Sequence, residues 1–239
     1  MNKTAIITAV AALLLAVGVA QADVVADDFE GGVNMGYWSF SGGDVIETTG
    51  GNPGAWLHSP TLDTFAPILD TAYGVEFFTG DYVAGHVTRI SGDFQTLHAD
   101  FGTAGYPLAL LLRDAAGTYD NIEDDVYVYW VDENLWIPQA GDGWTHYDFD
   151  IPSDFEGAPG ELPAGWFGGS YMTGSDVFPS DRTWQSVLAN VEKVEFWWIH
   201  PAWFGIFQQW EAGADNIELE LMVTTAAEES SLSAIKALY

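Results

Sequence analysis

Acidic side chains gather at two places in the sequence where they could hold a metal ion. In the segment RDAAGTYDNIEDDVYVYW, Asp120, Asp124 and Asp125 fall within six positions of one another. Calcium prefers six to eight oxygen ligands, and such a loop offers several. The spacing does not match an EF-hand, and Asp and Asn are favoured in hairpin turns anyway. The segment therefore predicts either a second, weaker calcium site or a solvated turn.

The other acidic group joins the two ends of the expected domain. Asp28 and Glu30 lie in ADDFEGG near its start, and Asp215 lies in GADNIEL near its end. If the first strand lies beside the last, these carboxylates approach one another, and backbone carbonyls near Gly51 and Asn52 could complete a shell of oxygen ligands. We therefore predict a structural calcium site here. The alternative is ordinary polarity at the start of a strand.

Tryptophan is concentrated between positions 191 and 221, in VEKVEFWWIHPAWFGIFQQWEAGADNIELEL. Strand alternation in VEFWWIH places Val194, Phe196 and Trp198 on one face. The opposite face, with Trp197 and Ile199, is also mainly apolar, which is typical of a strand covered on both sides. The pattern predicts that Trp198 is buried in the core.

The segment after this strand reads as a loop, because it opens with His-Pro and contains two glycines. Its aromatic rings stand among amide and carboxylate groups, a mixture that suits sugar rings with apolar C–H faces and polar hydroxyls. We expect Trp203 or Trp210 to be partly exposed. The alternative is a loop that folds back to seal the end of the domain. The residues expected to bind a ligand are Trp203, Trp210, Gln209, Glu211 and Trp136, the last in a second aromatic group with Trp130 and Trp144.

Few residue patterns in the chain suggest catalysis. There is no cysteine, which excludes thiol nucleophiles and thiolate metal sites. No Gly-x-Ser-x-Gly elbow, phosphate-binding loop or metalloprotease histidine pair occurs. The remaining enzymatic hypothesis is a glycosidase with paired carboxylates, for which Glu76, Glu195 and Glu211 stand in aromatic surroundings. Among so many acids, such neighbours arise by coincidence, so we favour a protein without enzyme activity.

The start of the chain predicts export. A short charged start and an apolar run precede Ala20-Gln21-Ala22, which has the form of a signal-peptidase site. We expect a signal peptide at 1–22, a β-sandwich domain at 23–224, and a spacer with a short amphipathic tail at 225–239. The exported protein would be extracellular or periplasmic, with no segment inserted in a membrane.

The net charge limits the partners of the chain. Six Lys and Arg residues stand against 35 Asp and Glu residues, which gives a formal net charge of −29. Nucleic acid and anionic membranes would be repelled by such a surface. Aromatic residues make up 15% of the chain, which argues against disorder.

Short alternating segments broken by Gly, Asp and Pro dominate the rest of the chain. In THYDFDI, for example, apolar and polar residues alternate strictly. Many such strands predict a mainly β, antiparallel jelly-roll sandwich. One short helix is expected before the penultimate strand, in SDRTWQSVLANV. Asp181 would cap it, and its apolar stripe would contain Trp184, Val187, Leu188 and Val191.

Three motifs in order resemble the laminin B type (laminin domain IV) β-sandwich in a diverged bacterial exported form. They are GGNPGAWLHSP at 50–60, FTGDY at 78–82 with the following strand VTRISGDFQTL, and VLANVEKVEFWWI at 187–199 followed by GADNIEL. The resemblance covers positions 26–221. It implies a jelly-roll sandwich related to carbohydrate-binding modules, no enzyme activity, and no ligand set that can be carried over. Cysteine-rich flanking modules are missing, so no basement-membrane role is implied.

Together these observations lead to one main hypothesis and two alternatives. The main hypothesis is a secreted, non-catalytic sandwich that binds a glycan or an extracellular matrix polymer, with calcium as its one expected cofactor. The first alternative is a self-associating structural or surface protein. The second is the sandwich glycosidase.

Overall fold

The structure is a computed structural model that describes residues 21–103, 105–172, 174 and 176–223. Residues Ala22–Met222 form one compact unit. The expected signal peptide, apart from its last two positions, and the expected tail at 225–239 lie outside the described residues. None of the described helices has the length and apolar character needed to cross a membrane.

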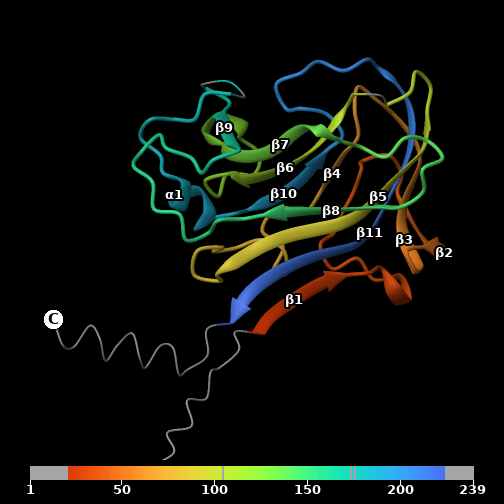
Figure 1. The fold of residues 1–239 in the computed structure, drawn as a ribbon, viewed down its shortest axis with the longest axis horizontal. Coiled ribbons are helices and arrows are strands. Elements are labelled where there is room, and N and C mark those ends of the chain that lie inside the picture. Colours follow the sequence, from red (N-terminus) through yellow and green to blue (C-terminus); the bar gives the residue numbers. More distant parts are fainter. Residues whose placement is uncertain (1–20, 104, 173, 175, 224–239) are drawn as a thin grey trace, which may run out of the picture. The chain divides into compact units, whose positions relative to one another are not determined.

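The described strands form two antiparallel sheets, which pack face to face as a sandwich (Figure 1). The six-stranded sheet has the order β2-β3-β11-β5-β8, with β1 paired to β11, and the five-stranded sheet has the order β4-β10-β6-β7-β9. The expected jelly-roll sandwich is therefore confirmed. The six-stranded sheet contains β1 (Gln21–Asp27), β2 (Val45–Gly51), β3 (Gly54–Thr64), β5 (Val87–Ala99), β8 (Thr145–Asp150) and β11 (Gln208–Val223). The five-stranded sheet contains β4 (Ile68–Asp70), β6 (Pro107–Asp114), β7 (Val126–Trp136), β9 (Trp166–Ser170) and β10 (Lys193–Trp197).

Aromatic rings from both sheets interlock in the core. From the six-stranded sheet, the Phe94 ring lies 4.8 Å from the ring of Phe196 and 5.2 Å from that of Trp198, measured between centroids. Phe149 also reaches Phe196, at 5.8 Å. Trp198 is fully buried, as predicted. The alternation predicted in THYDFDI is also confirmed, because Tyr147 and Phe149 of β8 are buried between exposed neighbours.

Strand β10 lies between β4 and β6 in the five-stranded sheet, and its inward face is apolar. Phe196 pairs with Leu69 of β4 and with Leu110 of β6, and all three side chains are buried in the core. Glu195 and Trp197 therefore point to the outer face of the five-stranded sheet. Glu195 is nevertheless shielded from water, at only 3% exposed, and Trp197 is half-buried.

The predicted helix is present as α1 (Trp184–Leu188), immediately before β10. Its apolar stripe is buried as predicted. The predicted cap, however, is wrong. Thr183 rather than Asp181 caps the helix, because the Thr183 hydroxyl accepts from the Ser186 N–H while the Ser186 hydroxyl accepts from the Thr183 N–H. Two short 3-10 turns, η1 (Glu30–Gly32) and η2 (Ile122–Asp124), complete the described elements.

The burial of Trp198 leads to a stability prediction. Trp198→Ala should lower the free energy of unfolding by about 3–5 kcal/mol, because it leaves a large cavity between the sheets. Phe204→Ala is the matched control, since that ring is 87% exposed, and it should change stability by no more than about 0.5 kcal/mol. Chemical denaturation of both variants measures the difference. Equal losses in the two variants would contradict this account of the core.

Candidate functional site

The aromatic residues expected to bind a ligand do not form one surface. Trp203 is 43% exposed and Trp136 is 54% exposed, so the expectation that Trp203 or Trp210 is partly exposed is confirmed through Trp203. Trp210 is fully buried, and its expected role in ligand contact is wrong. The reason is that β11 begins at Gln208, so that Trp210 points into the sandwich, where its indole N–H donates to the Thr64 carbonyl.

Gln209 and Glu211 flank Trp210 in the strand and therefore face outward on the six-stranded sheet. Glu211 is bound to the His58 ring, with Oε1 2.9 Å from Nε2. Trp203 instead stacks on His200, with centroids 5.2 Å apart and planes 15° apart. Glu195 and Glu211 thus lie on the outer faces of different sheets and cannot act across one sugar as a glycosidase pair.

The second expected aromatic group is also divided. Trp130 contacts Phe149 in the core, with ring centroids 5.5 Å apart. Trp144 lies against Trp56 of the six-stranded sheet and donates to the Gly50 carbonyl. Trp136 donates to the Glu133 carbonyl. Trp130 is thus part of the core packing and Trp144 lies on the six-stranded sheet, so neither shares a surface with Trp203.

The structure reveals a different candidate site, on the outer face of the five-stranded sheet. In β6, Leu110 and Leu112 face the core, while Leu111 and Arg113 face outward. In β7, Tyr127 and Tyr129 face outward in the same way, opposite Arg113 and Leu111 respectively. The alternation of Val and Tyr in VYVYW was the signal for this face. It was obscured in β6, where both sets of residues are apolar.

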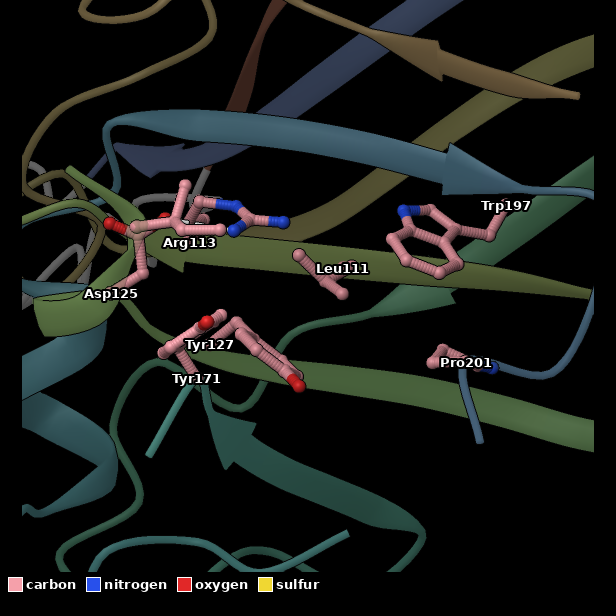
Figure 2. A pocket seen from close by; sticks show the side chains of 8 residues that line it. Leu111, Arg113, Asp125, Tyr127, Tyr171, Trp197 and Pro201 are labelled. Atoms are coloured by element: carbon pink, nitrogen blue, oxygen red, sulfur yellow. Dashed lines mark hydrogen bonds and ion pairs between the residues drawn. The ribbon is translucent and has the colours of Figure 1, made fainter. Parts of the chain in front are cut away.

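A hollow of about 200 Å³ opens on this outer face (Figure 2). Figure 2 shows the Arg113 guanidinium pointing along the sheet towards Leu111 and Trp197, with Tyr127 and Tyr171 close together beside it and Pro201 at the far side. Three aromatic rings and one fixed cation therefore surround the space. Its lining consists of Leu111, Arg113, Ile122, Asp125, Tyr127, Tyr171, Trp197 and Pro201.

Two carboxylates hold Arg113 in place. Its Nε and Nη2 donate to the two oxygens of Glu195 at 2.9 and 3.2 Å, and its Nη1 donates to Asp125 at 2.8 Å. Burial acts to lower the pKa of Arg113, but the charge of Glu195 and the bonds from Glu195 and Asp125 outweigh it and raise that pKa. Trp197 Nε1 donates to Glu195 at 2.7 Å and fixes the carboxylate further.

This arrangement leaves part of the guanidinium free to bind a ligand. Arginine carries five N–H donors, and three of them bond to side chains in the described part of the chain. The Asp125 and Glu195 side chains are only 3% and 4% exposed, so the group of one cation and two anions is held rigidly within the protein. Its formal charge of −1 disfavours an anionic ligand and suits uncharged hydroxyl groups.

The acidic residues Asp120, Asp124 and Asp125 do not gather around one point. Asp125 binds Arg113, whereas Asp124 accepts from the Thr118 hydroxyl at 2.8 Å. Asp120 is exposed on the turn before η2. The expectation that Asp120, Asp124 and Asp125 share a calcium ion is therefore corrected, because the start of β7 directs Asp125 onto the sheet and away from the turn.

The acidic residues at the chain ends do approach one turn, at residues 50–54. Asp215 accepts from the Asn52 N–H at 2.5 Å, and Glu30 accepts from the Ala55 N–H at 2.9 Å. Asp28 lies close enough to act on Asp215 by its charge. Burial raises the pKa of Asp215 to about 6, with further contributions from the charges of Asp93 and Asp28. Ionised Asp215 is therefore costly unless a cation offsets it.

Protein donors already satisfy much of this cluster. Asp93, absent from the predicted set, accepts from the side-chain amides of Asn52 and Asn216 at 3.1 and 2.8 Å. It also lies 2.7 Å from His146 Nδ1. Within the described parts of the chain, no three acidic or histidine side chains are close enough to hold a metal ion together. Calcium binding by Asp28, Glu30 and Asp215 stays a prediction, to which backbone carbonyls of the turn would have to contribute.

Comparisons with known proteins add the following. No protein-family model and no curated protein sequence matches the chain. Among solved structures, it is similar to a family 11 carbohydrate-binding module from Clostridium thermocellum in complex with a β-1,3-1,4-mixed-linked tetrasaccharide, at 15% identity and a TM-score of 0.46, over 87% of this chain and 99% of that one.

Two further structures are similar at lower scores. One is a family 27 module from Caldicellulosiruptor saccharolyticus in complex with mannohexaose, at 12% identity and a TM-score of 0.36, over 82% of this chain and 96% of that one. The other is the L4b domain of human laminin alpha-2, at 11% identity and a TM-score of 0.35, over 83% and 89%. All three scores lie below 0.5.

The cluster at the chain ends leads to a calcium prediction. Removing calcium with a chelator should lower the melting temperature by about 5–10 °C. When the calcium concentration is about a hundred times the Kd, binding adds ~2.7 kcal/mol to the free energy of unfolding. Each kcal/mol shifts Tm by about 2–4 °C at this chain length. Asp215→Ala should abolish the effect, whereas Asp124→Ala should retain it. A wild-type melting curve that is the same with and without chelator would end the idea.

Proposed function

We propose that the chain is an exported, non-catalytic module that binds an uncharged glycan on the outer face of its five-stranded sheet. The observation that carries the proposal is the hollow in which aromatic rings surround a clamped arginine with two unused N–H donors. Sugar rings need flat apolar surfaces for their C–H faces and polar groups for their hydroxyls. The hollow offers both.

The charge of the chain supports the choice of an uncharged glycan. At a formal net charge of −29, the protein repels polyanions such as uronate or sulfated polysaccharides, and the clamp itself adds no free positive charge. The arginine therefore acts as a fixed pair of hydrogen-bond donors. An extracellular matrix polymer is a ligand of this kind only if it presents uncharged sugars.

Self-association is the second candidate function, and one observation favours it. Phe204 is 87% exposed. The Phe65 ring contacts both Phe204 and Phe207, with centroids 5.0 and 5.4 Å away respectively. Exposed apolar clusters of this kind often mark interfaces. Light scattering over a range of protein concentrations, with Phe204→Ser as the comparison, distinguishes assembly from glycan binding.

Glycan binding is tested by affinity electrophoresis and pull-down with mixed-linkage β-glucan, mannan and agarose, and with alginate as the anionic comparison. We expect retention by at least one uncharged polymer and none by alginate. Tyr171→Ala should weaken binding about tenfold, equivalent to ~1.4 kcal/mol, because it removes an exposed ring from the hollow.

Phe101→Ala is the matched control for Tyr171→Ala, since it removes an exposed ring from the loop after β5. It should bind like the wild type. Absence of wild-type binding to every uncharged polymer, or equal losses in both variants, would contradict the proposed site.

A further inference from the structure

Tyr129 is a buried tyrosine whose hydroxyl has no partner among the described residues. It projects from β7 on the outer face of the five-stranded sheet, opposite Leu111, which lines the hollow. Burial raises the pKa of Tyr129 to about 12. An unpaired buried hydroxyl costs stability, so its presence on a candidate binding face points to a partner other than the described residues.

Tyr129 and Phe167 stack on each other across two neighbouring strands. They are paired neighbours on β7 and β9, their ring planes differ by 22°, and their centroids are 5.4 Å apart. Phe167 is 44% exposed. The stacked pair therefore offers a sugar apolar contact at its partly exposed ring, Phe167, and a hydrogen-bond partner at the unpaired Tyr129 hydroxyl.

His200 covers this stacked pair. Its ring lies edge-on to Tyr129, with centroids 5.8 Å apart and planes at 80°, and its centroid is 6.4 Å from that of Phe167. Trp203 stacks on the imidazole in turn. Burial lowers the pKa of His200 in spite of the nearby charges of Glu133 and Asp176. The imidazole thus occupies the place above the two rings that a ligand would need.

The segment that carries His200, residues 200–207, is weakly joined to the rest of the sandwich. The Trp203 N–H donates to the His200 carbonyl, and the Ala202 N–H donates to His200 Nδ1, so both bonds stay within the segment. Among the described residues, one hydrogen bond joins the segment to the remaining chain, from the Ile206 N–H to the Tyr106 hydroxyl at 3.4 Å. Packing of apolar side chains holds the rest, so His200 can be displaced at low cost.

We infer that Tyr129 and Phe167 form a second sugar-binding subsite, which His200 covers in the unliganded chain. A sugar ring of the bound glycan replaces the imidazole above the two aromatic rings, and one of its hydroxyls pairs with the Tyr129 hydroxyl. Pro201 borders the hollow and directly follows His200, so the subsite continues the hollow along the sheet. The inference rests on the proposed function and extends the site from one sugar position to two.

Two variants test the inference by affinity electrophoresis in mixed-linkage β-glucan, mannan or agarose, whichever retains the wild type. Tyr129→Phe removes only the unpaired hydroxyl, so its melting temperature should equal or exceed that of the wild type while its affinity falls about fivefold. His200→Ala removes the competing ring, so its affinity should rise severalfold. Opposite changes in the two variants, with folding retained, are difficult to explain by a general structural effect.

A spectroscopic measurement gives an independent readout. The His200 resonances, assigned by comparison with His200→Ala, are titrated by NMR with and without an oligosaccharide of the retaining polymer. The pKa of His200 should return towards its ordinary value when the sugar displaces the ring from its buried position. An unchanged His200 titration in the saturated complex would overturn the inference.

The outcomes distinguish this inference from the proposed function. If Tyr171→Ala loses affinity while Tyr129→Phe and His200→Ala bind like the wild type, the hollow binds glycan and the second subsite is wrong. A loss of affinity in His200→Ala would make His200 a ligand contact and also overturn the inference. If the wild type binds none of the polymers, both proposals fail.

Discussion

The contact of Phe94 with Phe196 and Trp198 is the interaction on which the rest of the structure depends. It joins the two sheets through rings that leave no room for either sheet to slide. Because β10 places Phe196 and Trp198 inward, Glu195 and Trp197 must point outward. Glu195 then anchors Arg113, and Trp197 lines the hollow. One face of β10 thus contributes to the core packing, and the opposite face contributes to the candidate binding site.

Much of the fold was predictable because it depends on alternation within single strands. The burial of Trp198 and the inward faces of β8 follow from a period of two and need no knowledge of the partner strands. The helix before β10 was predictable from its apolar stripe in the same way. Its cap was not, because both Asp181 and Thr183 suit that position, and the choice depends on where the preceding chain turns.

The site was much harder to predict, because it is assembled across strands. Arg113, Asp125 and Glu195 come from separate segments and meet only through the register of β6 with β7 and β10. The sequence showed Asp125 as one acid in an acidic turn. Trp210 and Trp203 stand close together in the sequence, yet the start of β11 between them sends one into the core and leaves the other beside His200. A chain segment read alone does not contain that boundary.

The clamp around Arg113 also limits how this protein can change over evolutionary time. Loss of the arginine would leave Asp125 and Glu195 as buried, uncompensated neighbours, and loss of either acid would release one side of the guanidinium. Each single step is costly, although replacement of all three by apolar residues need not be. Positions 113, 125 and 195 should therefore covary among homologous chains. The three residues would be replaced together, whereas the aromatic residues around them could be substituted one at a time.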